Sequence, residues 1–227
     1  MKSNMYDQAR TWNPFVGCLF DCIYCRYSFQ LQTKRQKQRC PLCAEYEPHF
    51  HPERLKRIPR ASIVFVCGYS DVRFALESTM LEIIKTVEQL EKPDQTFYFQ
   101  SKAPACFEPF LNAFSDNVIL LTTIETNRDA GYRAISKAPP PSIRYKQFRS
   151  LDFPRKVLTL EPLFKFDHEA MVQMVGEISP EYVWLGVNSK RRYKALKCLP
   201  EPSAEEFWKL HDTLSQFVDV KVKTEPV

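Results

Sequence analysis

The chain has 227 residues, of which 44% are hydrophobic and 26% are charged, so it has enough apolar material for a buried core and is not a disordered protein. Its 32 basic and 27 acidic residues give a net charge of +5, which is too small to define a partner by itself. Since no apolar run approaches the roughly 18 residues of a membrane span, the sequence also excludes a transmembrane helix.

The start of the chain lacks the features of an export signal. Residues Met1 to Asp7 are mostly polar and contain no apolar core. In a protein that stays in the reducing cytosol, clustered cysteines are more often metal ligands or catalytic groups than disulfides. We therefore expect a cytoplasmic protein in which some of the eight cysteines are functional.

Three cysteines follow Gly17 on what reads as one short loop. Cys18, Cys22 and Cys25 are separated by four and three residues, so their thiolates can converge on one face of an iron–sulfur cluster. Such clusters are held by cysteine thiolates, usually four of them. Three cysteines leave one iron without a protein ligand, and a substrate or cofactor can bind at such an open position, as it does at a catalytic zinc.

The positive charge is concentrated directly after this motif. Residues 26–60 include nine basic and three acidic residues, a balance of +6, so the remaining residues sum to −1. A second basic run covers residues 190–197. A single basic run is commonly a solvated surface, but two runs beside a metal motif favour an anionic partner, with nucleic acid as the first candidate.

A second cysteine pair lies inside the basic segment. Cys40 and Cys43 are followed by His49 and His51, a spacing suited to a zinc site. Two other interpretations stay open: two unconnected thiols, or a link with the first cysteine loop. His51 precedes a proline at an expected helix start, where it would act as a cap and leave the metal site one ligand short.

Beyond residue 60, short apolar runs alternate with helical patterns. The expected strands are Ile63–Cys67, Thr96–Gln100, Val118–Ile124, Lys156–Leu160, Tyr182–Val187 and Val218–Val222. Helical spacing predicts helices at residues 76–90 and 171–178, the second capped by Asp167. Ser203 and Glu206 form a capping box before an apolar stripe that ends at Phe217. Repeated βα units with apolar strands predict a parallel α/β sheet, either closed as a barrel or open and doubly wound.

Polar residues follow the expected strands. They include Gly68, Ser70 and Asp71, then Ser101 and Lys102, then Thr123 and Glu125, then Glu161, Asn188 and finally Lys223. Strands often end where polar loops begin, but ligands of parallel α/β proteins also bind at these carboxyl ends. Single acids placed directly at strand ends favour the second explanation, so Glu125 and Glu161 are candidate ligand-facing residues.

The cysteine spacing, with Tyr24 directly before the third cysteine, resembles the signature of radical S-adenosylmethionine (SAM) enzymes. Further short sequence segments resemble, in the same order, those of a protein family that occurs in phages and bacteria. That family is distantly related to spore photoproduct lyase. These segments are Trp12-Asn13-Pro14, His51-Pro52-Glu53-Arg54-Leu55, Phe99-Gln100-Ser101-Lys102, Thr123-Ile124-Glu125-Thr126 and Leu160-Glu161-Pro162.

The resemblance implies one domain, residues 1–227, with a partial (βα)6-type TIM barrel. The count of expected strands adds a seventh at Val218–Val222, beyond the usual six, and the basic, cysteine-containing segment at about 26–60 is interpreted as an insertion. It implies that Cys18, Cys22 and Cys25 bind a 4Fe-4S cluster. The reduced cluster would cleave SAM to methionine and a 5′-deoxyadenosyl radical that acts on a substrate. The electron would come from a donor such as flavodoxin or ferredoxin.

The resemblance also implies where SAM would bind. The expected contacts are Tyr24, Gly68, Ser70, Asp71, Lys102, Thr123, Glu125, Glu161, Asn188 and Lys223. Glu125 would bind the ribose hydroxyls, and Lys102 or Lys223 would meet the carboxylate. Cys67, at a strand end, is a candidate hydrogen donor to a product radical, although a free cysteine is more often a small core residue.

A different class of function explains the same cysteines. In that alternative the protein is a zinc-stabilised nucleic-acid-binding protein without catalysis. Cys18, Cys22, Cys25, Cys40 and Cys43 would then supply structural zinc ligands.

Overall fold

The computed structural model describes residues 9–90, 94–190 and 192–226. Residues Met1 to Asp7, on which the expectation about export rests, and Arg191 of the second basic run lie outside the described residues. In the part that is described, no helix combines the length and apolar character needed to cross a membrane.

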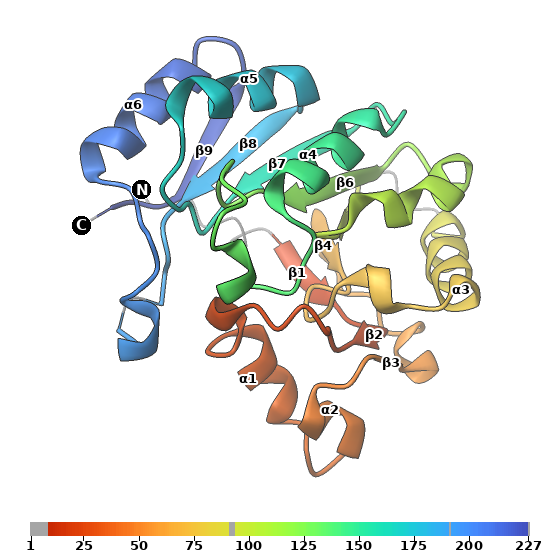
Figure 1. The fold of residues 1–227 in the computed structure, drawn as a ribbon. Coiled ribbons are helices and arrows are strands. Elements are labelled where there is room, and N and C mark those ends of the chain that lie inside the picture. The colour runs from red at the N-terminus through yellow and green to blue at the C-terminus, as the bar shows by residue number, and fades with distance from the viewer. Residues whose placement is uncertain (1–8, 91–93, 191, 227) are drawn as a thin grey trace.

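Seven parallel strands form one curled sheet, a half-barrel (Figure 1). Each strand pairs with the one that follows it in the order β1-β4-β5-β6-β7-β8-β9. The strands are β1 Ala9–Trp12, β4 Ile63–Val66, β5 Thr96–Gln100, β6 Val118–Thr123, β7 Lys156–Leu160, β8 Tyr182–Gly186 and β9 Asp219–Thr224. The strands therefore lie side by side in the order in which they follow one another along the sequence. This is the connectivity of a barrel, whereas a doubly wound sheet reverses its strand order partway. The predicted partial TIM barrel and its additional strand near the C-terminus are confirmed.

Helices cover the outer face of the sheet (Figure 1). They are α3 Glu77–Glu88, α4 Pro141–Ser150, α5 His168–Ile178 and α6 Ala204–Leu214. Short 3-10 helices occupy Ile23–Cys25, Pro52–Arg54, Val72–Phe74, Pro104–Ala113, Tyr132–Ala134 and Lys194–Leu196. After β5 the chain therefore forms a 3-10 stretch, which contains Pro109, in place of a regular α-helix.

The helix ends confirm one predicted cap and correct another. Ser203 and Glu206 form the predicted capping box at the start of α6. Asp167 stands at the N-cap position of α5 without a capping hydrogen bond, because its carboxylate is paired with Arg128 at 2.6 Å. Phe217 is 51% exposed and does not continue the buried stripe of α6.

Alternate residues of the strands face two different layers, as the two-residue period of a strand requires. Outward side chains such as Val64, Phe99 and Leu158 pack in the large core between the sheet and the helices. The inward apolar side chains form a second cluster of Ala9, Phe65, Tyr98, Ile119, Leu121, Val157, Tyr182 and Trp184. Further along the strands the inward positions become polar, at Gln100, Thr123, Thr159 and Glu161. The inner face thus changes from apolar to polar toward the carboxyl ends.

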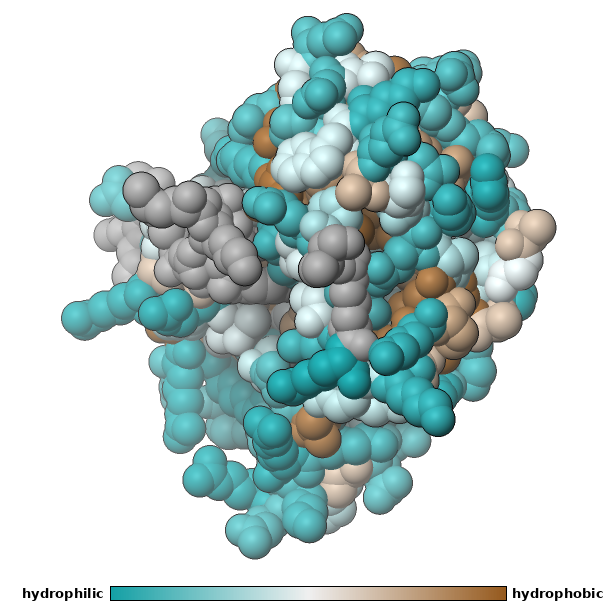
Figure 2. Space-filling view, turned by 90° about the vertical axis from the view of Figure 1, so that its left-hand side faces the viewer, coloured by the Kyte–Doolittle hydropathy of each residue, from teal (hydrophilic) through white to brown (hydrophobic). Residues whose placement is uncertain are grey.

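The segment predicted as an insertion, residues 26–60, carries α1 Phe29–Lys34, α2 Pro41–Glu45 and β3 His49–Phe50. Strand β3 pairs antiparallel with β2 Phe15–Val16, which leads into the cysteine loop. In Figure 1 this segment lies at the lower end of the molecule. Figure 2, which is turned about the vertical axis, shows mostly hydrophilic side chains at that lower end. We call residues 26–60 the insertion from here on.

Candidate active site

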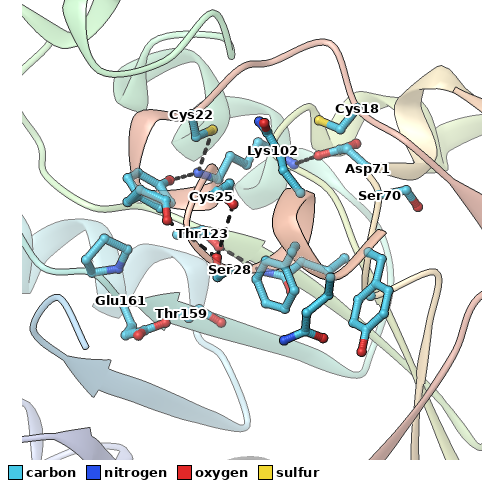
Figure 3. A pocket seen from close by; sticks show the side chains of 18 of the residues that line it. Cys18, Cys22, Cys25, Ser28, Ser70, Asp71, Lys102, Thr123, Thr159 and Glu161 are labelled. Carbon is cyan, nitrogen blue, oxygen red and sulfur yellow. Dashed lines mark hydrogen bonds between the residues drawn. The ribbon is translucent and has the colours of Figure 1, made fainter. Parts of the chain in front are cut away.

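A cavity of about 750 Å³ lies at the carboxyl ends of the strands (Figure 3). Its walls come from the cysteine loop, from α1 and from the polar strand ends. All three loop cysteines line it, as do Tyr24, Gly68, Ser70, Asp71, Lys102, Thr123, Glu161, Asn188 and Lys223. The volume is in the range of small-molecule sites, roughly 300–1,000 Å³. The structure therefore brings together most of the residues that the sequence predicts for one site.

The cysteine loop is folded so that its thiols lie close together. A 3-10 turn, Ile23–Cys25, places the Cys25 thiol within hydrogen-bonding reach of Cys22. The Cys22 thiol also contacts the Ser136 hydroxyl at 3.0 Å, and the Cys18 sulfur accepts the N–H of Phe20 at 3.4 Å. The loop is thus fixed at both ends, with its sulfur atoms on the cavity side.

A buried cation lies beside these thiols. The Lys102 ammonium is 3.4 Å from the Cys22 sulfur and 2.6 Å from a Glu125 oxygen. The hydrogen bond from Cys25, together with the charge of Lys102, lowers the pKa of the Cys22 thiol to about 6 although burial acts in the opposite direction. These contacts favour the thiolate form of Cys22, which is the form that binds iron. Burial raises the pKa of Cys18, and the hydrogen bond with Cys22, followed by burial, raises the pKa of Cys25.

Glu125 departs from the sequence-based prediction. Its carboxylate is 0% exposed and does not line the cavity, so it does not face a ribose. One oxygen is 2.7 Å from the Arg144 guanidinium; the other accepts hydrogen bonds from Lys102, from the Tyr132 hydroxyl at 3.0 Å and from Tyr24. Burial opposes ionisation, but Arg144 and Lys102 outweigh it and lower the pKa of Glu125 to about 2. The strand-end acid is thus the anionic centre of an internal charge network and not part of the cavity wall.

The loop after β4 supplies the polar wall nearest Cys18. The Asp71 carboxylate accepts hydrogen bonds from the Ser101 hydroxyl at 2.7 Å and from the Lys102 N–H at 2.8 Å. Burial raises the pKa of Asp71 to about 6 despite these bonds. The Ser70 hydroxyl donates to the Cys67 carbonyl at 2.8 Å. Asp71 and Ser70 thus line the cavity while also bracing the loop after β4.

The opposite wall carries polar atoms that lack partners. The Thr159 hydroxyl and the side-chain nitrogen of Asn188 are buried and have no hydrogen-bond partner in the described part of the chain, although both residues line the cavity. Nearby, Lys223 is paired with Glu161 at 2.9 Å. Buried polar atoms are normally satisfied, so this wall has unused hydrogen-bonding capacity for a polar ligand.

Cys67 also departs from the prediction of a site-facing thiol. Strand β4 ends at Val66, and Cys67 takes a left-handed backbone conformation with φ of 55°. Its side chain packs in the core between the sheet and the helices and does not line the cavity. Burial raises the pKa of this thiol to about 12. Cys67 is therefore a core residue, which was the alternative explanation.

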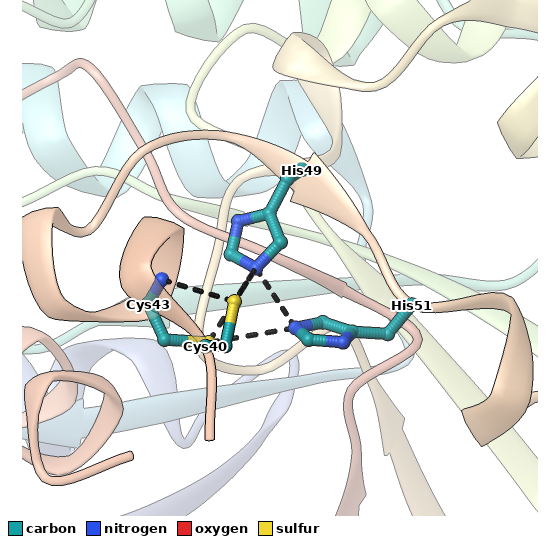
Figure 4. A group of neighbouring side chains, drawn as sticks. All are labelled: Cys40, Cys43, His49 and His51. Carbon is teal, nitrogen blue, oxygen red and sulfur yellow. Dashed lines mark hydrogen bonds between the residues drawn. The ribbon is translucent and has the colours of Figure 1, made fainter. Parts of the chain in front are cut away.

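Cys40, Cys43, His49 and His51 gather in a separate place (Figure 4). None of the four lines the cavity. His51 stands at the N-cap position of the short helix Pro52–Arg54 but makes no capping bond, because its ring points into this group and toward Glu53. The capping interpretation of His51 is therefore wrong.

The sequence analysis missed the supporting residues of the site. Arg144, Tyr132 and Ser136 contact Glu125 or Cys22 from segments without a motif. Arg144 sits in the polar helix α4, where an arginine is ordinarily exposed. No pattern in the sequence distinguishes it from its exposed neighbours.

Several solved structures of known proteins have a similar fold. No protein-family model matches the sequence, and no curated protein matches it. Among solved structures, a variant of spore photoproduct lyase superposes with a TM-score of 0.62 at 11% identity, over 100% of this chain and 81% of that one. Streptococcus suis SuiB bound to S-adenosylmethionine gives 0.60 at 9% identity, over 96% of this chain and 50% of that one. A radical SAM methyltransferase from Sphaerobacter thermophilus gives 0.58 at 12% identity, over 97% and 67%.

One of these neighbours is a radical SAM methyltransferase and another is bound to S-adenosylmethionine, and the chain shares their fold. At identities this low the likeness shows the common architecture alone. The chain spans about half the length of SuiB.

Proposed function

We propose that this protein is a radical SAM enzyme in which Cys18, Cys22 and Cys25 hold a 4Fe-4S cluster and SAM occupies the adjacent cavity. One observation carries the proposal: three thiols from one loop line a cavity whose opposite wall has buried polar atoms without partners. The cavity lies where parallel barrels bind ligands, at the carboxyl ends of their strands.

The donor set fits the cluster. Iron–sulfur clusters take thiolate ligands, and Lys102 offsets part of the negative charge that thiolates bring into a buried site.

When bound, the cluster supplies the electron that cleaves SAM to methionine and a 5′-deoxyadenosyl radical. A flavodoxin or ferredoxin of the cytoplasm would provide that electron. Thr159 and Asn188 would donate or accept the hydrogen bonds that orient the cofactor, and the inward rings of Phe65 and Tyr98 would close the cavity floor against water. Lys102 and Glu125 would hold the cysteine loop in position from beneath.

Replacing Cys22 by Ala tests the proposal. Anaerobically reconstituted parent protein should be brown and hold about four irons per chain, in addition to any zinc. The variant should lose most of this iron and form no 5′-deoxyadenosine after reduction with SAM. Iron analysis, visible absorption and chromatography of the nucleoside products measure these outcomes.

Cys198→Ala is the matched control, because Cys198 is an exposed free cysteine outside the site. It should keep the iron and the nucleoside product. A colourless parent protein that carries only zinc after anaerobic reconstitution would refute the cluster and support the non-catalytic zinc alternative.

We further propose an anionic substrate, with nucleic acid as the first candidate. Helix α1 of the insertion lines the cavity through Ser28, Phe29 and Gln30, and its exposed continuation carries Lys34 and Arg35. Lys190 reaches the same cavity from the other side. A phosphate backbone held by these cations would lie across the cavity opening.

Exchange of Lys34, Arg35 and Lys37 for Gln should weaken nucleic-acid binding about equally for all base sequences. Phosphate contacts release counterions, so the slope of log affinity against log salt should fall by about one for each contact removed. Lys85→Gln with Lys146→Gln, two exposed charges on the outer helices, is the control and should leave the slope unchanged. Fluorescence anisotropy across a salt series measures both. An affinity of the parent that does not change with salt would refute the nucleic-acid proposal.

A further inference from the structure

Four potential metal ligands come together inside the insertion (Figure 4). Cys40 and Cys43 flank the start of helix α2, and His49 and His51 come from strand β3 and the residue after it. The coordinating atoms of all four lie within 4.8 Å of one another. Cys43 is 0% exposed, so the group is closed on one side by protein.

Three of the distances between these atoms match the edges of a tetrahedron around one ion. The His49 Nε2 atom is 3.3 Å from the Cys40 sulfur and 3.4 Å from the Cys43 sulfur. The Cys43 sulfur is also 3.4 Å from the His51 Nε2 atom. Zinc bonds of about 2.0–2.3 Å in a tetrahedron put neighbouring ligand atoms roughly 3.3–3.8 Å apart.

Each of the two histidines makes a hydrogen bond through its Nδ1 atom to a group outside the cluster, and its Nε2 atom faces the two cysteines. The His49 Nδ1 atom is 2.6 Å from the Glu47 carbonyl oxygen, which only accepts, so this nitrogen carries the proton. The His51 Nδ1 atom is 2.9 Å from the Glu53 carboxylate and is a donor for the same reason. Each Nε2 atom then presents a lone pair, yet the two lie 2.8 Å apart. Two lone pairs facing each other repel unless a cation binds both.

We propose that Cys40, Cys43, His49 and His51 bind one zinc ion. Two thiolates and two imidazoles in a closed tetrahedral arrangement form the donor set of structural zinc. The Glu53 carboxylate and the Glu47 carbonyl hold the imidazoles in place, as partners behind zinc-bound histidines generally do.

The insertion contacts the main core through Phe50, Leu55 and Ile58, but its helical part buries little. Its helices α1 and α2 have six and five residues, and the only fully buried side chains they contain are Thr33 and Cys43. Segments of this size rarely bury enough apolar surface to stay folded without a metal or a disulfide. The zinc ion supplies this missing stabilisation.

The zinc site also contacts the approach to the cysteine loop. His49 pairs with Val16 in the β2–β3 ladder, and the His51 N–H donates to the Pro14 carbonyl at 2.6 Å. Val16 is followed directly by Gly17 and Cys18. The ion therefore ties the basic insertion to the strand that positions the first loop cysteine.

Metal analysis of full-length protein tests this site separately from the iron–sulfur cluster. The parent should retain one zinc per chain after dialysis against a weak chelator. A Cys40→Ser/Cys43→Ser variant should lose it, whereas Cys18→Ala/Cys22→Ala/Cys25→Ala should keep it. A parent without tightly bound zinc, or zinc that disappears with the loop cysteines and not with Cys40 and Cys43, would overturn the proposal. Failure of the cluster proposal leaves the zinc of the triple variant unchanged, so the two outcomes are distinguishable.

A milder pair of variants covers the case in which the double serine variant does not fold. Glu53→Gln should bind zinc about tenfold or more weakly, because it loses the carboxylate behind His51. Glu45→Gln, in the same insertion but outside the group, should bind zinc like the parent. Equal affinities for all three would refute the assigned role of Glu53 and His51.

Cobalt exchange reads out the coordination directly. Co²⁺ in the parent should give the intense visible ligand-field bands of a tetrahedral site together with thiolate charge transfer. His49→Asn should change these bands, and His211→Asn, on the distant helix α6, should not. Weak bands of octahedral cobalt in the parent would overturn the site.

Discussion

Replacing Glu125 by Leu should lower the free energy of unfolding by about 3–5 kcal/mol or more. The substitution leaves the Arg144 and Lys102 cations buried without their common counterion. Breaking one buried ion pair costs about 3–5 kcal/mol, and total stabilities are about 5–15 kcal/mol. Urea unfolding followed by circular dichroism measures the loss.

Two further variants identify the cause. Glu82→Leu, at an exposed position of α3, should change stability by no more than about 0.5 kcal/mol. Arg144→Met should cost less than Glu125→Leu, because Glu125 then keeps Lys102 as a partner. The opposite result, an unchanged stability of Glu125→Leu with loss of SAM binding alone, would restore the ribose-binding role that the sequence predicted for Glu125.

Gly17→Ala should have the second large effect, on both stability and iron content. Gly17 has a φ of +92°, and a Cβ atom there would lie 2.2 Å from the Glu47 carbonyl oxygen. The unfavourable backbone conformation costs roughly 1–2 kcal/mol and the overlap with backbone roughly 1–3 kcal/mol more. Since Cys18 is the next residue, the displaced loop should also take up less iron than the parent does.

Gly131→Ala separates the two contributions. Gly131 has a φ of +75°, but nothing lies within 4 Å of an added Cβ atom. This variant should therefore cost only the roughly 1–2 kcal/mol of the backbone term and keep its iron. If the two alanine variants lose the same stability, the close contact between Gly17 and the insertion does not constrain the loop.

The fold could be predicted because its signal is local. Apolar runs such as Thr96–Gln100 coincide with strands, and the Ser203–Glu206 box coincides with the start of α6. The alternation of strands and helices left a barrel and a doubly wound sheet as alternatives, and the resemblance to a known family favoured the barrel. The short helices of the insertion carry no strong periodicity, because most of their residues are exposed.

The site was predictable only in part, because spacing identifies residues and not the direction of their side chains. The loop cysteines and the strand-end residues Thr123, Glu161 and Asn188 do line the cavity. Glu125 and Cys67 also stand at strand ends, but a distant arginine attracts the first inward and a left-handed turn directs the second into the core. Neither event leaves a trace in the local sequence.

Among the described residues, β1 and β9 are the two edge strands of the curled sheet, and the cavity touches both. Arg10 and Thr11 of β1 line it on one side, and Lys223 and Thr224 of β9 line it on the other, yet no hydrogen bonds join these strands among the described residues. A closed barrel has a fixed circumference, because widening it breaks a strand pair. The open sheet of this chain lacks that constraint among the described residues, so the width of its cavity is not set by closure of a ring of strands.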